Sequence, residues 1–306
     1  MSDPRPIGVF DSGVGGLTVL REILRRLPHE STIYFGDNAR APYGTRSDEE
    51  VLAFSRQCLD ELTGRDVKAI VVACNTSTAV ALADLRRRYD LPILGVIRPG
   101  ASASALATRN RRVGVIGTPA TIRSHAYFLA IKDENPAIEV YEHATPALVP
   151  LVEAGRLAGP EVETVMRDAL APLLGERDAN GEFVFPLPAS ARIDTLLLGC
   201  THYPLLRPVI QTVAGERVAI VDSATATASA LVEVLAMNGL EAPGTTRGTA
   251  ADPGAAGHTA PEERVVPATH LQLTTGDLAT FRELAGRLFG SAFPDVARVT
   301  LEVPVR

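Results

Sequence analysis

Two cysteines of the chain occur in the same local setting. Cys74 ends the apolar run in "KAIVVACNTSTA", residues 68–79, and Cys200 ends the run in "DTLLLGCTHYPL", residues 194–205. Hydroxyl residues follow each cysteine, where a strand would give way to a helix. Ligands of α/β proteins bind at the carboxyl ends of parallel strands, and a helix N-terminus lowers the pKa of a thiol. A single free cysteine usually packs as a small apolar residue, but two in this setting indicate chemistry.

The third cysteine, Cys58, falls on the apolar face of a helix that we predict over residues 47–62, so we expect it in the core. The chain has 3 cysteines, too few for a disulfide scaffold, and they are expected as free thiols of a reducing compartment. No apolar run reaches the roughly 20 residues that span a bilayer, and the N-terminus lacks the regions of a signal peptide. These features predict a cytoplasmic protein.

Three further side chains are candidates for proton transfer. His202 follows Cys200 closely, which suits an acid or base that assists this thiol. Asp11 lies between an apolar run and a glycine-rich turn, "FDSGVGGLTVL", residues 10–20, so it either caps the next helix or handles protons and ammonium groups. The turn can present N–H groups to a carboxylate or phosphate, although it matches neither the dinucleotide-binding nor the P-loop spacing. Glu153, judged from the sequence alone, is a solvated helix residue.

The composition argues against several other classes of function. The formal net charge is −6 and the basic residues are scattered, which gives no footprint for nucleic acid. The spacing of Cys200 and His202 is poor for zinc, and the absence of a C-x-x-C motif argues against a redox centre. The only lysines, Lys68 and Lys132, do not lie at a strand end where a pyridoxal phosphate Schiff base would form. We therefore expect no metal and no cofactor.

Nine apolar runs must supply the framework for these side chains. They are continuous instead of alternating, as in parallel strands covered on both faces, and helical segments separate them. This order predicts an α/β fold with right-handed crossovers. The runs are Ile7–Phe10, Thr32–Phe35, Ala69–Ala73, Ile93–Ile97, Val113–Ile116, Ile138–Tyr141, Thr195–Leu198, Val218–Val221 and His270–Thr274.

A second repeat indicates two similar halves. "IGVFDSGVGGLTVL", residues 7–20, resembles "VGVIGTPATIRSHA", residues 113–126, and in each half a cysteine-ending strand follows. We predict two pseudo-symmetric α/β domains, each with a mainly parallel sheet flanked by helices, and an active site in the cleft between them. The first domain comprises residues 1–98 and 209–306, and the second residues 99–208.

Two polar segments are expected to lie away from the chemistry. Residues 175–192, "GERDANGEFVFPLPASAR", are predicted to form a surface insertion. Residues 242–264 are rich in Ala, Gly, Pro and Thr and are predicted to form a mobile loop.

Six motifs together resemble one known family. "FDSGVGGLTVL", "YFGDNARAPYG", "ACNTSTA", "GVIGTPATI", "PLVEAG" and "LGCTHYPLL" occur in this order. They are similar to the motifs of bacterial glutamate racemases, in the aspartate/glutamate racemase superfamily. The similarity covers residues 6 to about 235 and returns in "LTTGDLATFRELA".

The resemblance implies a set of functional residues. Cys74 and Cys200 match the family's two catalytic thiols, Asp11 matches the acid that assists the first thiol, and His202 and Glu153 match the groups that assist the second. The positions that match substrate-binding residues are Asp11, Ser12, Tyr43, Gly44, Asn75, Thr76, Thr118, Thr121, Thr201 and His202.

The resemblance also implies the reaction. It is a cofactor-independent racemisation of L-glutamate to D-glutamate, which supplies D-glutamate for peptidoglycan, by an enzyme that we expect to be a homodimer without membrane or nucleic-acid partners. A thiolate on one face of the α-carbon would remove the proton while a thiol on the other face delivers one. Aspartate is the nearest alternative substrate. Two other classes stay open on the residues alone: a cysteine hydrolase or decarboxylase, and a non-catalytic amino-acid-binding module.

Overall fold

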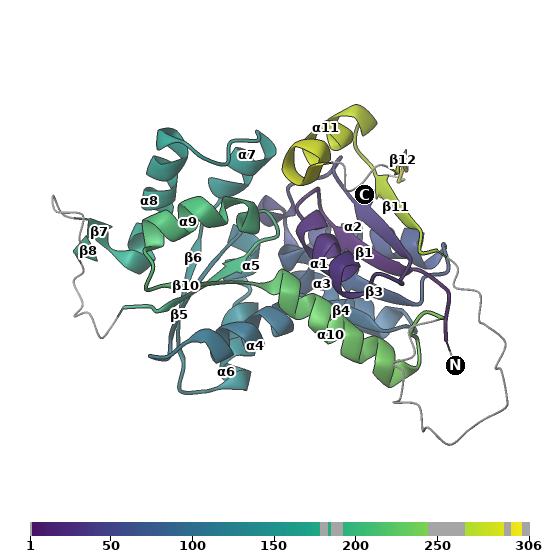
Figure 1. The fold of residues 1–306 in the computed structure, drawn as a ribbon, viewed down its shortest axis with the longest axis horizontal. Coiled ribbons are helices and arrows are strands. Elements are labelled where there is room, and N and C mark those ends of the chain that lie inside the picture. Colours follow the sequence, from purple (N-terminus) through teal and green to yellow (C-terminus); the bar gives the residue numbers. More distant parts are fainter. Residues whose placement is uncertain (1, 178–182, 185–191, 244–266, 291–294, 302–306) are drawn as a thin grey trace, which may run out of the picture.

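The computed structural model describes residues 2–177, 183–184, 192–243, 267–290 and 295–301. Each of the nine apolar runs predicted as strands contributes to a strand. The run predicted from Ile93 ends early, because Ile97 already begins a helix. The chain forms two parallel sheets flanked by helices, which confirms the predicted fold class (Figure 1).

The first sheet has six parallel strands in the order β12-β11-β2-β1-β3-β4. Its strands are β1 (Ile7–Asp11), β2 (Thr32–Gly36), β3 (Ala69–Val72), β4 (Ile93–Gly95), β11 (His270–Thr274) and β12 (Val296–Arg298). Apolar residues from α1 (Leu17–Arg26), α10 (Ser223–Asn238) and α11 (Leu278–Phe289) cover one face. Residues from α2 (Asp48–Thr63) and α3 (Asn75–Arg88) cover the other.

The second sheet has four parallel strands in the order β10-β9-β5-β6. They are β5 (Arg112–Gly117), β6 (Glu139–Ala144), β9 (Thr195–Gly199) and β10 (Ala219–Asp222). Apolar residues from α7 (Leu148–Glu153), α8 (Pro160–Leu174) and α9 (Arg207–Ala214) cover one face, and those from α4 (Ile97–Ala107) and α6 (Ala126–Glu134) cover the other. The short helix α5 (Pro119–Arg123) follows β5.

The two sheets share a strand order. The order β2-β1-β3-β4 in the first corresponds to β6-β5-β9-β10 in the second, and β11 and β12 extend only the first. The registers agree as well, since Phe10 pairs with Val72 and Ile116 pairs with Leu198. The strands that precede Cys74 and Cys200 are therefore equivalent.

The strands of the second sheet extend further along the chain than the predicted second domain, residues 99–208. The predicted boundary after residue 208 falls inside α9, whereas β10 pairs with β9 in the second sheet, and only α10 returns to the first. We propose that the second domain extends to Asp222, because a strand belongs with the sheet that satisfies its backbone hydrogen bonds.

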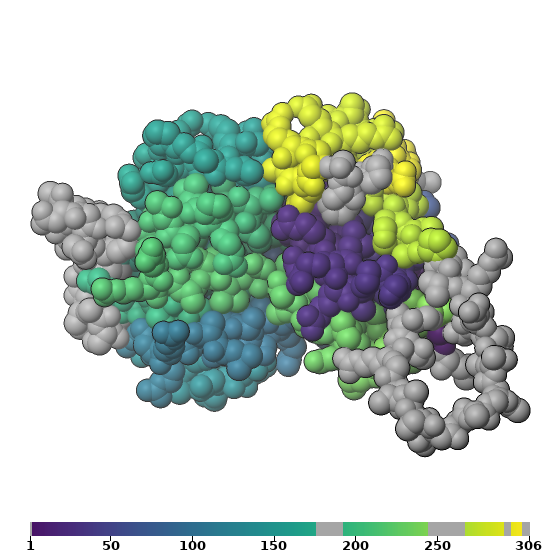
Figure 2. Space-filling model, viewed as in Figure 1, coloured from purple at the N-terminus to yellow at the C-terminus, as the bar shows by residue number. Residues whose placement is uncertain are grey.

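Contacts at the C-terminal end also join the halves. Leu288 of α11 packs against apolar residues of both halves, and the Arg287 guanidinium lies 3.4 Å from the Ala154 carbonyl oxygen at the end of α7. Figure 2 shows α11, in yellow, against the teal surface of the second half.

The polar segments are described only in part. Residues 175–192 contain the antiparallel pair β7 (Glu176–Arg177) and β8 (Phe183–Val184) and otherwise lie outside the described residues. Most of the predicted loop at residues 242–264 also lies outside them. Among the described helices, none has the length and apolar composition that crossing a bilayer requires.

Candidate active site

One enclosed pocket collects the cysteines that follow the equivalent strands. Cys74 comes after β3 and Cys200 after β9, and both line a pocket with about 20 Å³ of free volume, room for about one water molecule. The lining residues are Ser12, Gly13, Ala41, Pro42, Tyr43, Gly44, Cys74, Asn75, Thr76, Thr118, Val149, Glu153, Cys200, Thr201 and His202. The structure thus places all the site residues predicted from the sequence in this lining except Asp11 and Thr121, which lie behind it.

Sequence reasoning missed four lining residues. Ala41 and Pro42 belong to the quoted motif "YFGDNARAPYG", and Gly13 belongs to the glycine-rich turn, so motif membership was the available signal. Val149 of α7 carries no such signal, because an apolar helix residue has the same appearance whether it faces a core or a pocket.

Cys74 caps the helix that it precedes. Its Sγ accepts a hydrogen bond from the Ser77 backbone N–H at 3.4 Å and donates to Ser12 Oγ at 3.6 Å. Burial, and next the charge of Asp11, raise the pKa of the Cys74 thiol to about 11. The thiol is therefore protonated in neutral solution, in spite of the helix N-terminus.

Asp11 occupies the glycine-rich turn that the sequence suggested for a ligand anion. Its Oδ2 accepts from the N–H groups of Gly13 at 3.1 Å and Gly16 at 2.9 Å, and its Oδ1 accepts from Thr201 Oγ1 at 3.3 Å. Burial raises the pKa of this carboxyl, although the His202 charge and the N–H groups oppose the rise. Glycine is required at 16, because a Cβ there would lie 2.4 Å from Asp11 Cβ.

Cys200 has an imidazole as its neighbour. Nδ1 of His202 lies 3.8 Å from Cys200 Sγ, and Nε2 of the same ring lies 3.4 Å from Glu153 Oε1. Burial opposes protonation of His202, but its contacts with Cys200 and Glu153 outweigh burial and raise the pKa to about 10. The Glu153 side chain, 37% exposed, is not fully solvated as the sequence suggested, since it closes the pocket and holds the ring.

Three threonine hydroxyls join the halves beside the pocket. Thr76 Oγ1, at the start of α3, lies 2.9 Å from Thr118 Oγ1 and 3.4 Å from Thr121 Oγ1, both of the second half. Gly44 lets the chain approach this cluster, because a Cβ at 44 would lie 2.5 Å from Thr118 Cβ. These hydroxyls can donate to a ligand oxygen from both sides of the cleft.

Asn75 supplies a donor without a partner. Its side chain is buried, and its Nδ2 has no hydrogen-bond partner in the described part of the chain. Its Oδ1, in contrast, accepts from the Tyr127 hydroxyl at 2.6 Å. A buried donor left unpaired costs free energy, so the pocket favours a ligand that brings an acceptor such as a carboxylate.

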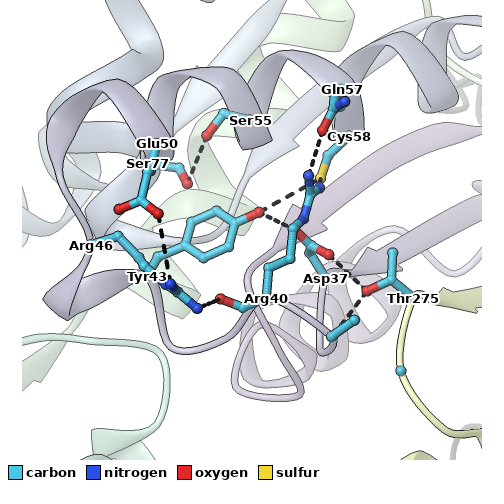
Figure 3. A network of polar contacts seen from close by, with 12 residues as sticks. Asp37, Arg40, Tyr43, Arg46, Glu50, Ser55, Gln57, Cys58, Ser77 and Thr275 are labelled. Carbon is cyan, nitrogen blue, oxygen red and sulfur yellow. Dashed lines mark hydrogen bonds and ion pairs between the residues drawn. The ribbon is translucent and has the colours of Figure 1, made fainter. Parts of the chain in front are cut away.

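The wall that carries Tyr43 rests on a buried polar network (Figure 3). The Tyr43 hydroxyl donates to Asp37, which also accepts from Arg40 Nε at 2.6 Å and from Thr275 Oγ1 at 2.7 Å. Cys58 lies behind this wall, 3.6 Å from Arg40 Nη2. Burial, and next the charge of Asp37, raise the pKa of its thiol well above the usual range, so Cys58 is an unreactive core residue.

The lysines lie away from the pocket. The Lys68 ammonium is buried 2.6 Å from Glu30 Oε2, and Lys132 Nζ donates to the carbonyl of Pro136 at 3.0 Å. Within the described ranges, no group of three or more His, Cys, Asp and Glu side chains has the arrangement of a metal site.

Comparison with known proteins gives consistent matches. The model of the Asp/Glu/Hydantoin racemase family matches residues 7–181. A glutamate racemase from Shouchella clausii is 42% identical over 301 residues, which cover 98% of this chain and 96% of that protein. The crystal structure of the glutamate racemase isoform RacE1 from Bacillus anthracis matches with a TM-score of 0.81 and 38% identity, covering 99% of both chains. The glutamate racemase of Francisella tularensis, solved with D-glutamate, has a TM-score of 0.79 and 32% identity, covering 98% of this chain and 99% of that one.

Proposed function

The chain belongs to the Asp/Glu/Hydantoin racemase family, and we propose that it interconverts L-glutamate and D-glutamate by a two-base mechanism without a cofactor. One observation carries the proposal: two buried thiols, at the ends of equivalent strands, line the same enclosed pocket from different halves. A cysteine hydrolase needs a single nucleophilic thiol, and a binding module needs none, so neither accounts for the pair.

The neighbours of the thiols support a direction of proton transfer. A protonated His202 places a positive charge beside Cys200 Sγ, 3.8 Å from Nδ1, and burial together with Asp11 holds a proton on Cys74. With L-glutamate bound, Cys200 takes the α-proton from one face of the carbon and Cys74 gives its own proton to the other face. The α-carbon loses one proton and gains one, with inversion. After D-glutamate leaves, the thiols return to their first state by exchanging protons with solvent, and the reverse reaction starts from the opposite protonation state.

The remaining pocket residues suit the ends of the substrate. Asn75 Nδ2 and the hydroxyls of Ser12, Thr76 and Thr201 can donate to the carboxylates, as do the backbone N–H groups of the helix that begins at Asn75. Donors fixed in a pocket without bulk water also stabilise the charge that develops on the carboxylate when the α-proton leaves. We propose that the D-glutamate formed supplies peptidoglycan synthesis. All three cysteines are free, which fits action in the cytoplasm.

The test is incubation of the pure protein with L-glutamate in D₂O, with EDTA and a carbonyl reagent present. We expect the optical rotation to decay to zero while NMR shows the α-hydrogen replaced by deuterium. L-Aspartate in a parallel sample is expected to react far more slowly. Unchanged rotation, or activity only after addition of a metal or pyridoxal phosphate, would contradict the proposal.

We also propose that the protein is a homodimer. A groove of about 730 Å³, lined by none of the predicted site residues, runs along α4, α6 and α10. Leu106 and Leu129 at this groove are 86% and 58% exposed, and apolar surface of this kind marks interfaces. Sedimentation is expected to give a dimer for the wild type and more monomer for Leu106→Asp. A monomeric wild type would contradict this assignment.

A further inference from the structure

Tyr127 contacts both of the turns that carry the cysteines. Its hydroxyl donates to Asn75 Oδ1 at 2.6 Å, and Asn75 follows Cys74 directly. Its ring lies against Gly199, the residue before Cys200, where a Cβ would be only 3.0 Å from the ring. Tyr127 itself belongs to α6 and is fully buried, outside the pocket lining. One side chain thus touches the neighbour of each thiol.

The hydroxyl of Tyr127 has a defined direction. Gly100 leaves room for Tyr127 and Ser223 side by side, since a Cβ at 100 would lie 3.1 Å from Ser223 Cβ and 3.3 Å from the Tyr127 oxygen. The tyrosine proton is directed at Asn75 Oδ1. A carboxamide that accepts at Oδ1 must turn its Nδ2 the other way, and this Nδ2 is the unpaired donor of the pocket.

We propose that Tyr127 is a positioning residue of the racemase, which fixes the Asn75 carboxamide so that its N–H groups, and not its oxygen, face the bound substrate. The inference rests on the proposed function, because it assigns a carboxylate of the amino acid as the acceptor. A carboxamide turned by 180° would set its oxygen against that carboxylate and repel it. Both enantiomers carry the same carboxylate, so Tyr127 serves both directions equally.

The test is a double-mutant cycle on Tyr127→Phe and Asn75→Ala, with KM and kcat measured from each enantiomer. Tyr127→Phe removes one oxygen atom and keeps the ring, so it is expected to fold. We expect KM to rise about 10-fold in both directions, the equivalent of one hydrogen bond, with kcat changed by less than about 3-fold. In the Asn75→Ala background, Tyr127→Phe is expected to leave KM unchanged, because a residue that acts through Asn75 has nothing left to position.

Tyr203→Phe is the matched control. Tyr203 is buried to the same extent and close to Cys200 in the sequence, but its hydroxyl donates to the Thr145 carbonyl at 2.9 Å, away from the pocket. Its loss is expected to lower the melting temperature without raising KM. Binding is followed separately as the increase in melting temperature that glutamate gives, which should shrink in Tyr127→Phe and not in Tyr203→Phe.

The outcomes separate this inference from the proposed function. If the wild type does not racemise glutamate, the proposed function fails first. If the wild type is active and Tyr127→Phe keeps its KM, or raises KM equally with and without Asn75, Tyr127 does not act through Asn75 and the inference is overturned.

Discussion

The two cysteine turns have the same backbone framework and opposite chemical neighbours. Cys74 and Cys200 follow equivalent strands, yet the acid Asp11 stands at the end of β1 where Gly117 ends β5. Conversely, His202 lies two residues after Cys200, and the residue two positions after Cys74 is Thr76. The charge of Asp11 acts on the Cys74 thiol, whereas an imidazole lies beside Cys200. The fold makes the thiols equivalent in position, and two side chains give them different electrostatic surroundings.

This difference fixes where the proton rests before substrate arrives. The pKa of Cys74 is raised to about 11, and His202, whose pKa is raised to about 10, stays protonated beside Cys200. The ligand-free enzyme therefore holds a proton at Cys74 and a positive charge on His202, beside Cys200. Under the proposed mechanism this is the state that accepts L-glutamate.

The largest expected effect tests what the two turns share. Cys74→Ala and Cys200→Ala should each lower kcat by about 10³-fold or more, because each removes a group that transfers a proton. Racemisation is followed by optical rotation. Cys58→Ala, in the core behind the pocket wall, should keep most of the activity. A near wild-type rate in either active-site variant would refute the two-base mechanism.

The next effect tests what the turns do not share. Asp11→Asn should slow deprotonation of D-glutamate, and His202→Asn that of L-glutamate, by about 10- to 100-fold, the effect of moving a thiol pKa by one or two units. The equilibrium constant must stay near unity, since the enantiomers have equal free energy in water. Primary isotope effects with each α-deuterated enantiomer report which step became slower. Isotope effects that rise on the same enantiomer in both variants would show that the faces are misassigned.

Alkylation should distinguish the thiols directly. At pH 8 iodoacetamide should label Cys200, which lies beside the positively charged His202, faster than Cys74, whose raised pKa keeps its thiol protonated. Peptide mass spectrometry gives both rates, and bound glutamate should protect both sites. The ratio of the two labelling rates should fall in His202→Asn, which lacks the positive charge beside Cys200. Faster labelling of Cys74 in the wild type would reverse the comparison.

The last expected effect is on stability. Between pH 6.5 and about 10 the folded protein keeps a proton on His202 that the unfolded chain has lost, so the free energy of unfolding falls as pH rises through this window. The contribution of His202 is complete below pH 6.5 and absent above about pH 10. The difference in urea-unfolding free energy between wild type and His202→Asn should shrink accordingly. A difference independent of pH would mean that His202 is neutral in the fold.

The sequence predicted what local patterns determine. Continuous apolar runs located the strands, and the position of Cys74 and Cys200 at strand ends led to the pocket. It did not predict β12 or the role of Tyr127. The hydrogen bond between Tyr127 and Asn75 joins residues 52 positions apart and depends on how α6 packs against the first half. No motif encodes such packing.

The same limit applies to Asp11 and to the domain boundary. The glycine-rich turn was a candidate for an external anion, but its N–H groups at Gly13 and Gly16 already bind the carboxylate of Asp11. A turn that binds its own side chain and one that binds a ligand have the same composition. The predicted boundary after residue 208 leaves β10 out of the second domain. We propose the later boundary because an edge strand belongs with its pairing partner, which its apolar run does not reveal.

The small free volume of the pocket limits how substrate enters and how product leaves. A pocket of about 20 Å³ is smaller than glutamate, so we expect the halves to separate when substrate enters and again when product leaves. If proton transfer is faster than opening and closing, increased solvent viscosity should lower kcat. The two enantiomers have the same size and charge, so neither enters or leaves the pocket more easily than the other. Net flow through the enzyme is set by the concentrations outside, and only steady withdrawal of D-glutamate by a later reaction can keep it moving in one direction.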